Sequence, residues 1–324
     1  MAAVDAWHEA RLLAAQDVGR DIRLFEIEPA DGTVPWSPGS HIDVGVLAGG
    51  RPDTRSYSLV GDPTPGVYRI AVKRLPESRG GSAYMWGLAP SARLRITRPR
   101  NHFDLAYGRP DYLLIAGGIG ITPLVGMALA LARRGERMRM LYAVHGRADL
   151  AFAAELRDQL GDRLELFVTE EGPRIDLAAE IARLAPGGEC YVCGPIPMLN
   201  DAKRAWAESG RPVGSLRFET FGSSGRWAPE PFEVRIPRLG RTVHVPESKS
   251  MLDALEEAGV EMIWDCRRGE CGLCTVDILE ADGIVDHRDV FFSEAQKAEN
   301  RKLCTCVSRV VKGGITIDTA DRSS

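Results

Sequence analysis

The sequence predicts a multi-domain fold that combines an antiparallel β-barrel, an α/β domain with a parallel sheet, and a smaller α+β domain. Three observations predict this class. Residues 1–107 hold short β-rich stretches, residues 108–226 alternate apolar strands with helices, and residues 227–324 carry five of the seven cysteines. The length of 324 residues suits more than one domain, since domains usually span about 100–200 residues.

The composition is that of an ordinary soluble globular protein, with 44% hydrophobic and 27% charged residues. No apolar run reaches the roughly 18 residues of a membrane span. Charges throughout residues 1–23 argue against a signal peptide, and the clustered cysteines fit a reducing cytoplasm. The net charge is −5 over residues 227–324 and +1 over the rest, which fits either steering toward a basic partner or plain surface solubility. No basic tract with interleaved aromatic residues predicts nucleic-acid binding.

Short β-rich stretches, bounded by Gly, Pro and Asp clusters, predict the strands of the barrel. They are Ile22–Glu28, Ile42–Val46, Arg55–Val60, Val67–Lys73 and Arg93–Thr97. Within one of them, period-two alternation places Arg55 and Tyr57 on one face and Ser58 on the other.

A glycine turn precedes a short helix that is expected at Ala83–Leu88. Gly80, Gly81 and Ser82 form this turn. Free amides at a helix start, together with the positive end of the helix dipole, form an anion-binding arrangement.

A second glycine turn follows the buried parallel strand that is expected at Tyr112–Ala116. The turn contains Gly118 and Gly120, and we expect Thr122 as the N-cap and Pro123 as the first residue of the next helix. Because glycines allow close backbone approach and the dipole favours an anion, Gly118, Gly120 and Thr122 predict a pyrophosphate cradle. The glycine order departs from the G-x-G-x-x-G fingerprint, so a purely structural turn stays an alternative.

The rest of the α/β domain continues this alternation. Further strands are expected at Met138–Val144, Leu164–Thr169 and Glu189–Cys193, and helices at Leu124–Arg134, Asp149–Leu160, Asp176–Leu184 and Pro197–Ser209. Cys193 ends a strand, which is where ligands bind in such sheets. Cys190 and Cys193 form a C-x-x-C pair, but their place within a buried strand disfavours a redox disulfide. Arg147 follows the second strand, where an arginine can meet a 2′-phosphate, a ribose or a pyrophosphate.

The cysteines of the last domain carry the most specific signal. Cys266, Cys271 and Cys274 have C-x4-C-x2-C spacing, the plant-type pattern for a [2Fe–2S] cluster whose fourth ligand is distant. Gly269 and Gly272 suit a loop that must turn tightly and point its amides at sulfur. A zinc site usually takes two C-x2-C pairs, which this spacing fits poorly.

The elements around these cysteines are expected as a hairpin, a helix and two strands. They are Phe232–Ile236 with Thr242–Val245, a helix capped by Ser250 with Asp253, and the strands Thr275–Glu280 and Gly314–Asp318. Residues 222–225 read as a flexible linker.

Several motifs occur together in one order: R-x-Y-S at 55–58, V-K-R at 72–74, G-G-S at 80–82 and R-P-R-N-H-F at 98–103. This order resembles the phthalate dioxygenase reductase and vanillate O-demethylase reductase family, and the resemblance covers essentially the whole chain. It implies an FMN-binding β-barrel over 1–107, an NAD-binding α/β domain over 108–226 and a β-grasp, ferredoxin-like [2Fe–2S] domain over 227–324.

The resemblance also implies roles in the flavin site. Arg55 pairs with the flavin phosphate, Tyr57 lies against the isoalloxazine, and Ser58 approaches its reactive edge. Lys73 and the amides of Gly80, Gly81 and Ser82 complete the site, and the implied flavin is FMN rather than FAD.

In the nicotinamide site, the C-G-P-x-x-M stretch at 193–198 resembles the family motif in which the cysteine lies near the nicotinamide. Cys193 and Met198 are therefore expected there, with NADH rather than NADPH as the donor. Phe221, in a segment that resembles one approaching the flavin, is expected to pack by the ring, with a core aromatic as the alternative.

The fourth cluster ligand has two candidates. Cys304 follows Cys274 after 29 intervening residues, a common ferredoxin gap, and Cys306 follows after 31. The surroundings of Cys306 resemble those of the fourth ligand in ferredoxins and in oxygenase reductases, and Asp282-Gly283 suits a turn that tolerates a two-residue insertion. We therefore expect Cys306.

The implied activity is that of an NADH-dependent reductase, a monomer that passes electrons from NADH to FMN, to the [2Fe–2S] cluster and then to a Rieske-type terminal oxygenase. A reductase that serves a cytochrome P450 or another iron acceptor has the same motifs. A redox-sensing cluster protein is a different class, which the flavin and nicotinamide motifs disfavour.

Overall fold

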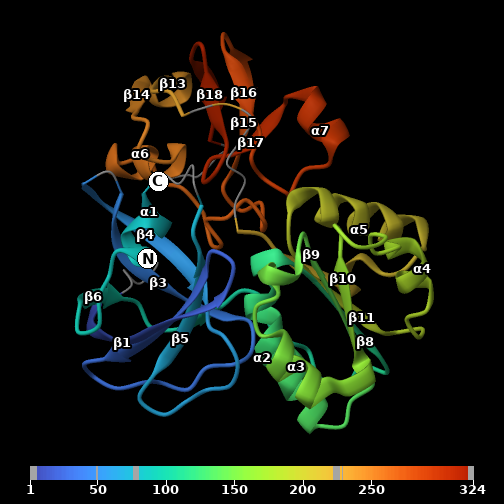
Figure 1. The fold of residues 1–324 in the computed structure, drawn as a ribbon. Helices are drawn as coiled ribbons and strands as arrows, with labels where there is room; N and C mark the ends of the chain where they lie inside the picture. Colours follow the sequence, from blue (N-terminus) through green and yellow to red (C-terminus); the bar gives the residue numbers. More distant parts are fainter. Residues whose placement is uncertain (1–5, 49, 76–79, 222–226, 228, 320–324) are drawn as a thin grey trace. The chain divides into compact units, whose positions relative to one another are not determined.

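The computed structural model describes residues 6–48, 50–75, 80–221, 227 and 229–319. The linker expected at 222–225 lies outside these residues. The chain forms two compact units, unit 1 (residues 1–219) and unit 2 (residues 220–324), and Figure 1 labels their elements.

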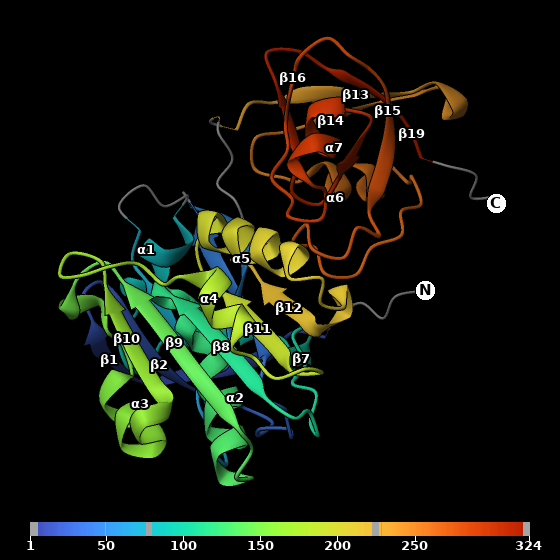
Figure 2. The same ribbon diagram turned by 90° about the vertical axis from the view of Figure 1, so that its right-hand side faces the viewer.

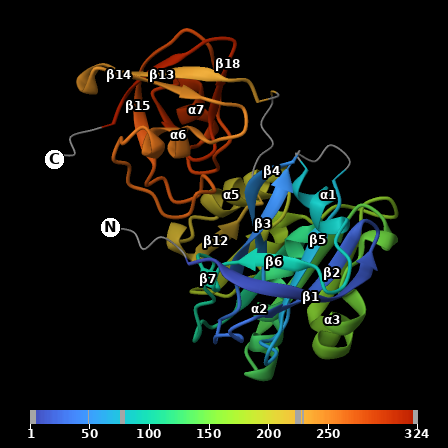
Figure 3. The ribbon, with the colours of Figure 1, turned by 90° about the vertical axis from the view of Figure 1, so that its left-hand side faces the viewer.

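Unit 1 begins with an antiparallel sheet in the order β4-β3-β6-β1-β2-β5, with β7 paired to β3. A bridge between Leu59 and Ile70 joins the regions of β4 and β5 at the two edges, as expected for a barrel. The strands, which can be followed in Figure 3, are β1 (His8–Gly19), β2 (Ile22–Pro29), β3 (Ser40–Ala48), β4 (Arg51–Ser58), β5 (Tyr68–Lys73), β6 (Arg93–Ile96) and β7 (Arg100–Asn101), and helix α1 spans Gly81–Trp86. All five expected strands are confirmed, whereas β1 had not been expected.

The second sheet of unit 1 is parallel and has the order β10-β9-β8-β11-β12. Its strands, seen side by side in Figure 2, are β8 (Tyr112–Gly117), β9 (Met138–Val144), β10 (Leu164–Val168), β11 (Glu189–Cys193) and β12 (Leu216–Glu219). The helices are α2 (Ile121–Arg133) and α3 (Ala153–Leu160), which pack together, and α4 (Leu177–Ala182) and α5 (Ile196–Glu208), which do the same. Short 3₁₀ turns lie at η1 (Gly118–Gly120), η2 (Arg147–Asp149), η3 (Gly161–Arg163) and η4 (Val213–Ser215).

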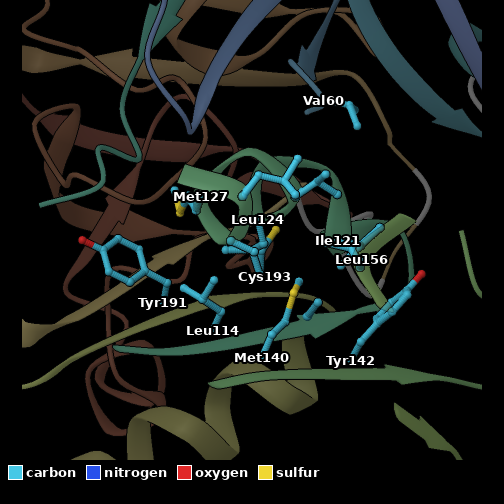
Figure 4. Close-up of a cluster of buried hydrophobic side chains, with 14 of the residues drawn as sticks. Val60, Leu114, Ile121, Leu124, Met127, Met140, Tyr142, Leu156, Tyr191 and Cys193 are labelled. Carbon is cyan, nitrogen blue, oxygen red and sulfur yellow. The ribbon is translucent and has the colours of Figure 1, made fainter. Parts of the chain in front are cut away.

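One hydrophobic core joins the two sheets of unit 1, and a second core fills the barrel. Figure 4 shows part of the first core, where Leu124 of α2 and Val60 of the barrel belong to the same cluster as Leu114 and Tyr142 of the parallel sheet. Ile22 is also in this cluster. Because the barrel and the α/β region bury side chains against each other, they form a single packed body.

Unit 2 contains a mixed sheet in the order β14-β13-β19-β15-β17, in which β13 and β19 are parallel and the other pairs antiparallel. The elements are β13 (Phe232–Ile236), η5 (Pro237–Leu239), β14 (Arg241–Val245), α6 (Met251–Glu257), β15 (Thr275–Ala281), α7 (Glu294–Glu299), β17 (Lys302–Cys304) and β19 (Ile315–Asp318), with a separate ribbon of β16 (Ile284–Asp286) and β18 (Arg309–Val311). The capping box of Ser250 and Asp253 at α6 is confirmed. Helix α6 covers a core that includes Val234, Leu255 and Ile317.

In the described parts of the chain, none of the helices combines the length and apolar character that a membrane crossing requires.

Candidate functional site

Five cysteines gather in unit 2 as two groups. Cys266 and Cys271 lie within hydrogen-bonding reach of each other, and the thiols of Cys304 and Cys306 both bond to the sulfur of Cys274. Those bonds lower the pKa of Cys274 to about 3 and raise the pKa of both partners. Burial raises the pKa of Cys266. The fold thus brings together the thiol of Cys274 and those of Cys304 and Cys306, which follow it by 30 and 32 positions.

The thiol pairs fit a two-iron cluster. In the described ranges, no three His, Cys, Asp or Glu side chains are arranged to hold one metal ion. A [2Fe–2S] cluster makes a different demand, because each of its two irons takes two thiolates from a set of four cysteines. Cys266 with Cys271, and Cys274 with a thiol from residues 304–306, match that demand.

The loop around Cys266 is shaped to stabilise negative charge on sulfur. The backbone N–H groups of Arg268, Glu270 and Cys271 each donate to Cys266 Sγ over 3.4 Å. Gly269 makes this possible with a φ of +74°, a conformation that side chains rarely adopt. Amides aimed at a ligand sulfur also tune the potential of a cluster.

Two contacts favour Cys306 over Cys304 as the fourth ligand. Cys306 interacts with Cys266 of the other pair and receives a hydrogen bond from the N–H of Gly269. Cys304 lies within β17, fully buried, where the carboxylate of Asp289 helps to raise its pKa. The choice of Cys306 remains a prediction that these contacts support.

The residues expected at the flavin phosphate come together in the barrel. A Cβ added at Gly81 would lie 2.6 Å from Arg55 Nε, so the guanidinium packs directly on the start of α1. The helix begins after Gly80, whose φ is +103°, and has no side-chain cap. Ser82 is already engaged, because its Oγ accepts from Leu75 N at 3.3 Å. Arg55 forms an ion pair with Asp53 at 2.7 Å, so a bound phosphate would compete with this carboxylate for the guanidinium group.

Tyr57 and Lys73 are the other two side chains expected in the flavin site. Burial raises the pKa of Tyr57 to about 12, although the charge of Arg55 acts in the opposite direction. Lys73 is half-buried at the end of β5, and its charge acts on Asp149.

Ser58 has a buried partner that the sequence did not reveal. Its hydroxyl donates to Glu219 Oε2 at 3.3 Å, and both side chains are almost completely buried. Ser58 ends β4, whereas Glu219 ends β12 of the parallel sheet. Since 161 residues separate them, no local motif could predict the pair.

The glycine turn after β8 packs against the end of β11. A Cβ at Gly120 would lie 2.2 Å from the carbonyl oxygen of Cys193, and one at Gly117 would lie 3.0 Å from Met198 Sδ. Gly118 has a φ of +55° and open space around it. The two motifs that were expected to bind the nicotinamide cofactor therefore meet at the carboxyl edge of the sheet, where ligands bind in this fold.

The expected N-cap of α2 was wrong. The helix begins at Ile121 after Gly120, and Thr122 lies inside its first turn, where its hydroxyl donates to Ile119 O at 3.0 Å. The cause is η1, which continues directly into the helix. No side chain caps this helix start. The backbone N–H groups that directly follow η1 donate to the carbonyls of Gly118 and Ile119.

Acidic side chains surround the position expected to distinguish the two nicotinamide cofactors. Arg147 pairs with Glu171 at 2.7 Å, and His145 lies 3.2 Å from Glu170. The two glutamates follow β10, whereas Arg147 and His145 follow β9. Only Arg147 had been expected at this position.

The last residues singled out in the sequence are Phe221, Cys190 and Cys193. Phe221 is 48% exposed, and its position beside the flavin stays a prediction. Cys190 and Cys193 are fully buried residues of β11 and belong to no disulfide. Residues three apart in a strand point to opposite faces, so the two cysteines do not form a disulfide.

Comparison with known proteins places these sites in a family. The model of the "2Fe-2S iron-sulfur cluster binding domain" matches residues 234–311, and that of the "Oxidoreductase NAD-binding domain" matches residues 114–204. The chain is 38% identical over 304 residues to the phenoxybenzoate dioxygenase subunit beta of Ectopseudomonas oleovorans, covering 92% of this chain and 93% of that one. It is 34% identical over 320 residues to the vanillate O-demethylase oxidoreductase of a Pseudomonas species, covering 96% and 99%.

Comparison with solved structures supports the same family. The structure of phthalate dioxygenase reductase matches with a TM-score of 0.78 at 29% identity, over 97% of this chain and 98% of that one. Full-length CYP116B46 from Tepidiphilus thermophilus matches with a TM-score of 0.70 at 38% identity, over 96% of this chain but only 42% of that one. The three expected kinds of domain are confirmed: an antiparallel flavin-binding sheet, a parallel NAD-binding sheet and a mixed ferredoxin-like sheet. The chain is a flavin- and iron–sulfur-dependent NAD(P)H oxidoreductase, and it belongs to the phthalate dioxygenase reductase and vanillate O-demethylase reductase family.

Proposed function

We propose that this protein is the NADH-dependent reductase component of a two-component oxygenase and passes electrons through FMN and a [2Fe–2S] cluster to a Rieske-type terminal oxygenase. The observation that carries the proposal is the likeness to the vanillate O-demethylase oxidoreductase, which extends over 96% of this chain and 99% of the relative. We assign flavin binding to residues 1–107, nicotinamide binding to 108–226 and cluster binding to 227–324.

Bound flavin accepts two electrons as a hydride and releases them singly, and a [2Fe–2S] cluster accepts one electron at a time. The residues of this chain act by placement. Gly118, Gly120 and the uncapped start of α2 hold the nicotinamide pyrophosphate, and Cys193 and Met198 border its ring.

On the flavin side, Arg55 and the first amides of α1 hold the phosphate of FMN, because the planar guanidinium fork suits phosphate oxygens. Tyr57 packs on the ring, and Ser58 with Glu219 borders its reactive edge. No side chain is required as a general base, since a hydride carries its own electron pair.

Four thiolates, from Cys266, Cys271, Cys274 and Cys306, hold the cluster. Cys266 Sγ accepts three backbone N–H hydrogen bonds, which stabilise its negative charge.

The preference for NADH rests on the carboxylates after β10. Glu171 already neutralises Arg147, the cation best placed to receive a 2′-phosphate, and Glu170 adds a further negative charge nearby. A 2′-phosphate would face like charges there, whereas a ribose hydroxyl can donate to a carboxylate.

The test is an anaerobic titration of the purified protein with NADH and, in parallel, with NADPH. Absorbance follows the flavin, EPR follows the cluster, and chromatography identifies the released flavin. We expect FMN, bleaching by NADH at far lower concentration than by NADPH, and a rhombic [2Fe–2S] signal. Reduced flavin without a cluster signal would leave a simple flavin reductase and contradict the proposal.

A reductase for a cytochrome P450 is the second candidate. It is favoured by the match to CYP116B46, in which a chain like this one corresponds to 42% of the larger protein. Reconstitution separates the two candidates, because NADH consumption coupled to product requires the correct acceptor. A redox sensor would fail an earlier test, since it would not reduce cytochrome c catalytically with NADH.

A further inference from the structure

A buried glutamate lies between two of the expected cluster ligands. Glu270 directly precedes Cys271, and its side chain is only 10% exposed. One carboxylate oxygen, Oε1, accepts both the backbone N–H of Thr220 at 2.7 Å and its hydroxyl at 3.0 Å. The other oxygen, Oε2, lies 3.7 Å from Arg268 Nη2.

The backbone of the same residue is also engaged. The N–H of Glu270 donates to Cys266 Sγ at 3.4 Å, beside the amides of Arg268 and Cys271. Glu270 therefore ties the cluster loop to Thr220 through its side chain and to a ligand sulfur through its backbone. Thr220 is 2% exposed, so removal of the carboxylate would leave two buried donors unsatisfied.

Thr220 is covalently bonded to Glu219, whose carboxylate accepts the hydroxyl of Ser58. Glu219, which binds Ser58, and Thr220, which binds Glu270, are therefore joined by a single peptide bond. Glu294, by contrast, is an exposed carboxylate that pairs with Lys297 at 3.2 Å.

We propose that Glu270 is a positioning residue that anchors the cluster loop to Thr220 and thereby sets the rate at which electrons reach the cluster. This inference rests on the proposed function, in which a single electron leaves reduced flavin and reduces one ferric iron without any bond being made or broken. The anchor acts on the shape of the loop and on the Glu219–Thr220 segment, so it affects the transfer to the cluster and leaves hydride transfer to the flavin intact.

The first arm of the test measures hydrogen–deuterium exchange of the Thr220 amide in the holoprotein. Glu270→Ala removes the acceptor, and we expect this amide to exchange about tenfold faster. Glu270→Gln keeps an acceptor oxygen, so exchange should stay near the wild-type rate. Thr220→Val keeps the N–H and loses only the hydroxyl, and Glu294→Gln is the matched surface control.

The second arm resolves anaerobic reduction by NADH into a flavin phase and a cluster phase in a stopped-flow instrument. In Glu270→Ala we expect the flavin phase to stay within about twofold and the cluster phase to slow by about tenfold or more. Glu270→Gln should restore most of the cluster phase, and Thr220→Val should lie between them.

Unchanged exchange at Thr220 in Glu270→Ala would overturn the anchor, and equal slowing of both phases would overturn its specific effect on the cluster. The exchange arm needs no electron donor, so it decides the anchor by itself. Failure of the wild-type protein to be reduced by NADH would instead refute the proposed function.

Discussion

At the residue scale, Cys306 and Cys304 show how the structure narrows a choice that spacing left open. Both thiols reach Cys274, but Cys306 also interacts with Cys266 and with the amide of Gly269. Spacing alone would favour Cys304, because its gap from Cys274 is the common one. The fourth ligand must lie close to the other three thiolates. This depends on the folded position of the cysteine and not on the number of residues between it and Cys274.

We therefore expect Cys306→Ser to abolish the visible and EPR spectra of the cluster while Cys304→Ser retains them. The two substitutions are matched, because each removes one buried thiol from the same segment. Iron content and EPR of the reduced proteins provide the measurement. Loss of the cluster in Cys304→Ser alone would show that Cys304 is the ligand.

Residues within motifs were predictable from the sequence, whereas their partners were not. The meeting of Arg55 with Gly81, and of Gly120 with Cys193, joins motifs that were each recognised separately. Glu270 occupies an unspecified position inside the cysteine motif, and Glu219 was given no role; their partners lie 50 and 161 residues away. Only the fold brings such residues together, so a single sequence contains no local signal for them.

At the element scale, β1 is the largest difference between expectation and structure. Its sequence, HEARLLAAQDVG, is rich in Ala, Leu, Glu and Arg, which favour helices in isolation. Irregular pairing with β2 between Leu12 and Ala14, and again between Asp17 and Gly19, breaks the alternation that would have indicated a strand. Pairing with both β2 and β6 overrides the local preference.

The start of α2 yields a prediction for an element. Gly120→Ala would place a Cβ 2.2 Å from the carbonyl oxygen of Cys193, so the glycine turn and the end of β11 must move apart. We expect a loss of stability of about 1–3 kcal/mol, as for other overpacked sites, and weaker binding of NAD⁺. Gly172→Ala is the control, since its Cβ would meet nothing within 4 Å.

Thermal unfolding and calorimetric titration with NAD⁺ measure the two effects. Normal stability and affinity in Gly120→Ala would show that the close packing of the turn on β11 is not required.

At the scale of the whole molecule, unit 1 joins two sheets that the sequence presented as separate domains. An ion pair reinforces the shared core: Arg20, in the turn after β1, binds Asp149 of η2 through both Nε and Nη2 at 3.1 and 3.0 Å. Burial acts to raise the pKa of Asp149, but hydrogen bonds from Arg20 and from the N–H of Gly146 outweigh it and hold the pKa below its ordinary value.

This depressed pKa predicts how the stability of unit 1 depends on pH. The stabilisation from Asp149 is fully present above the ordinary carboxyl pKa of about 3.9 and is lost as the pH falls through the lower value of the folded state. Asp149→Asn, which does not titrate, should be less stable than wild type by about 1 kcal/mol at pH 7, because Arg20 is half-exposed. The difference should shrink as the pH falls below the ordinary carboxyl pKa and through the lower value of the folded state.

Denaturant unfolding followed by circular dichroism across this pH range is the measurement. A difference that stays constant with pH would exclude the ionised pair as its source.

The place of β19 has a consequence for the making of the protein. This strand lies between β13 and β15, at the centre of the sheet of unit 2. On the ribosome the sheet cannot close until residue 318 has emerged, a dozen residues after Cys306. Every strand of unit 1 emerges earlier, so iron delivery can only follow the synthesis of the parts that we propose bind flavin and nicotinamide.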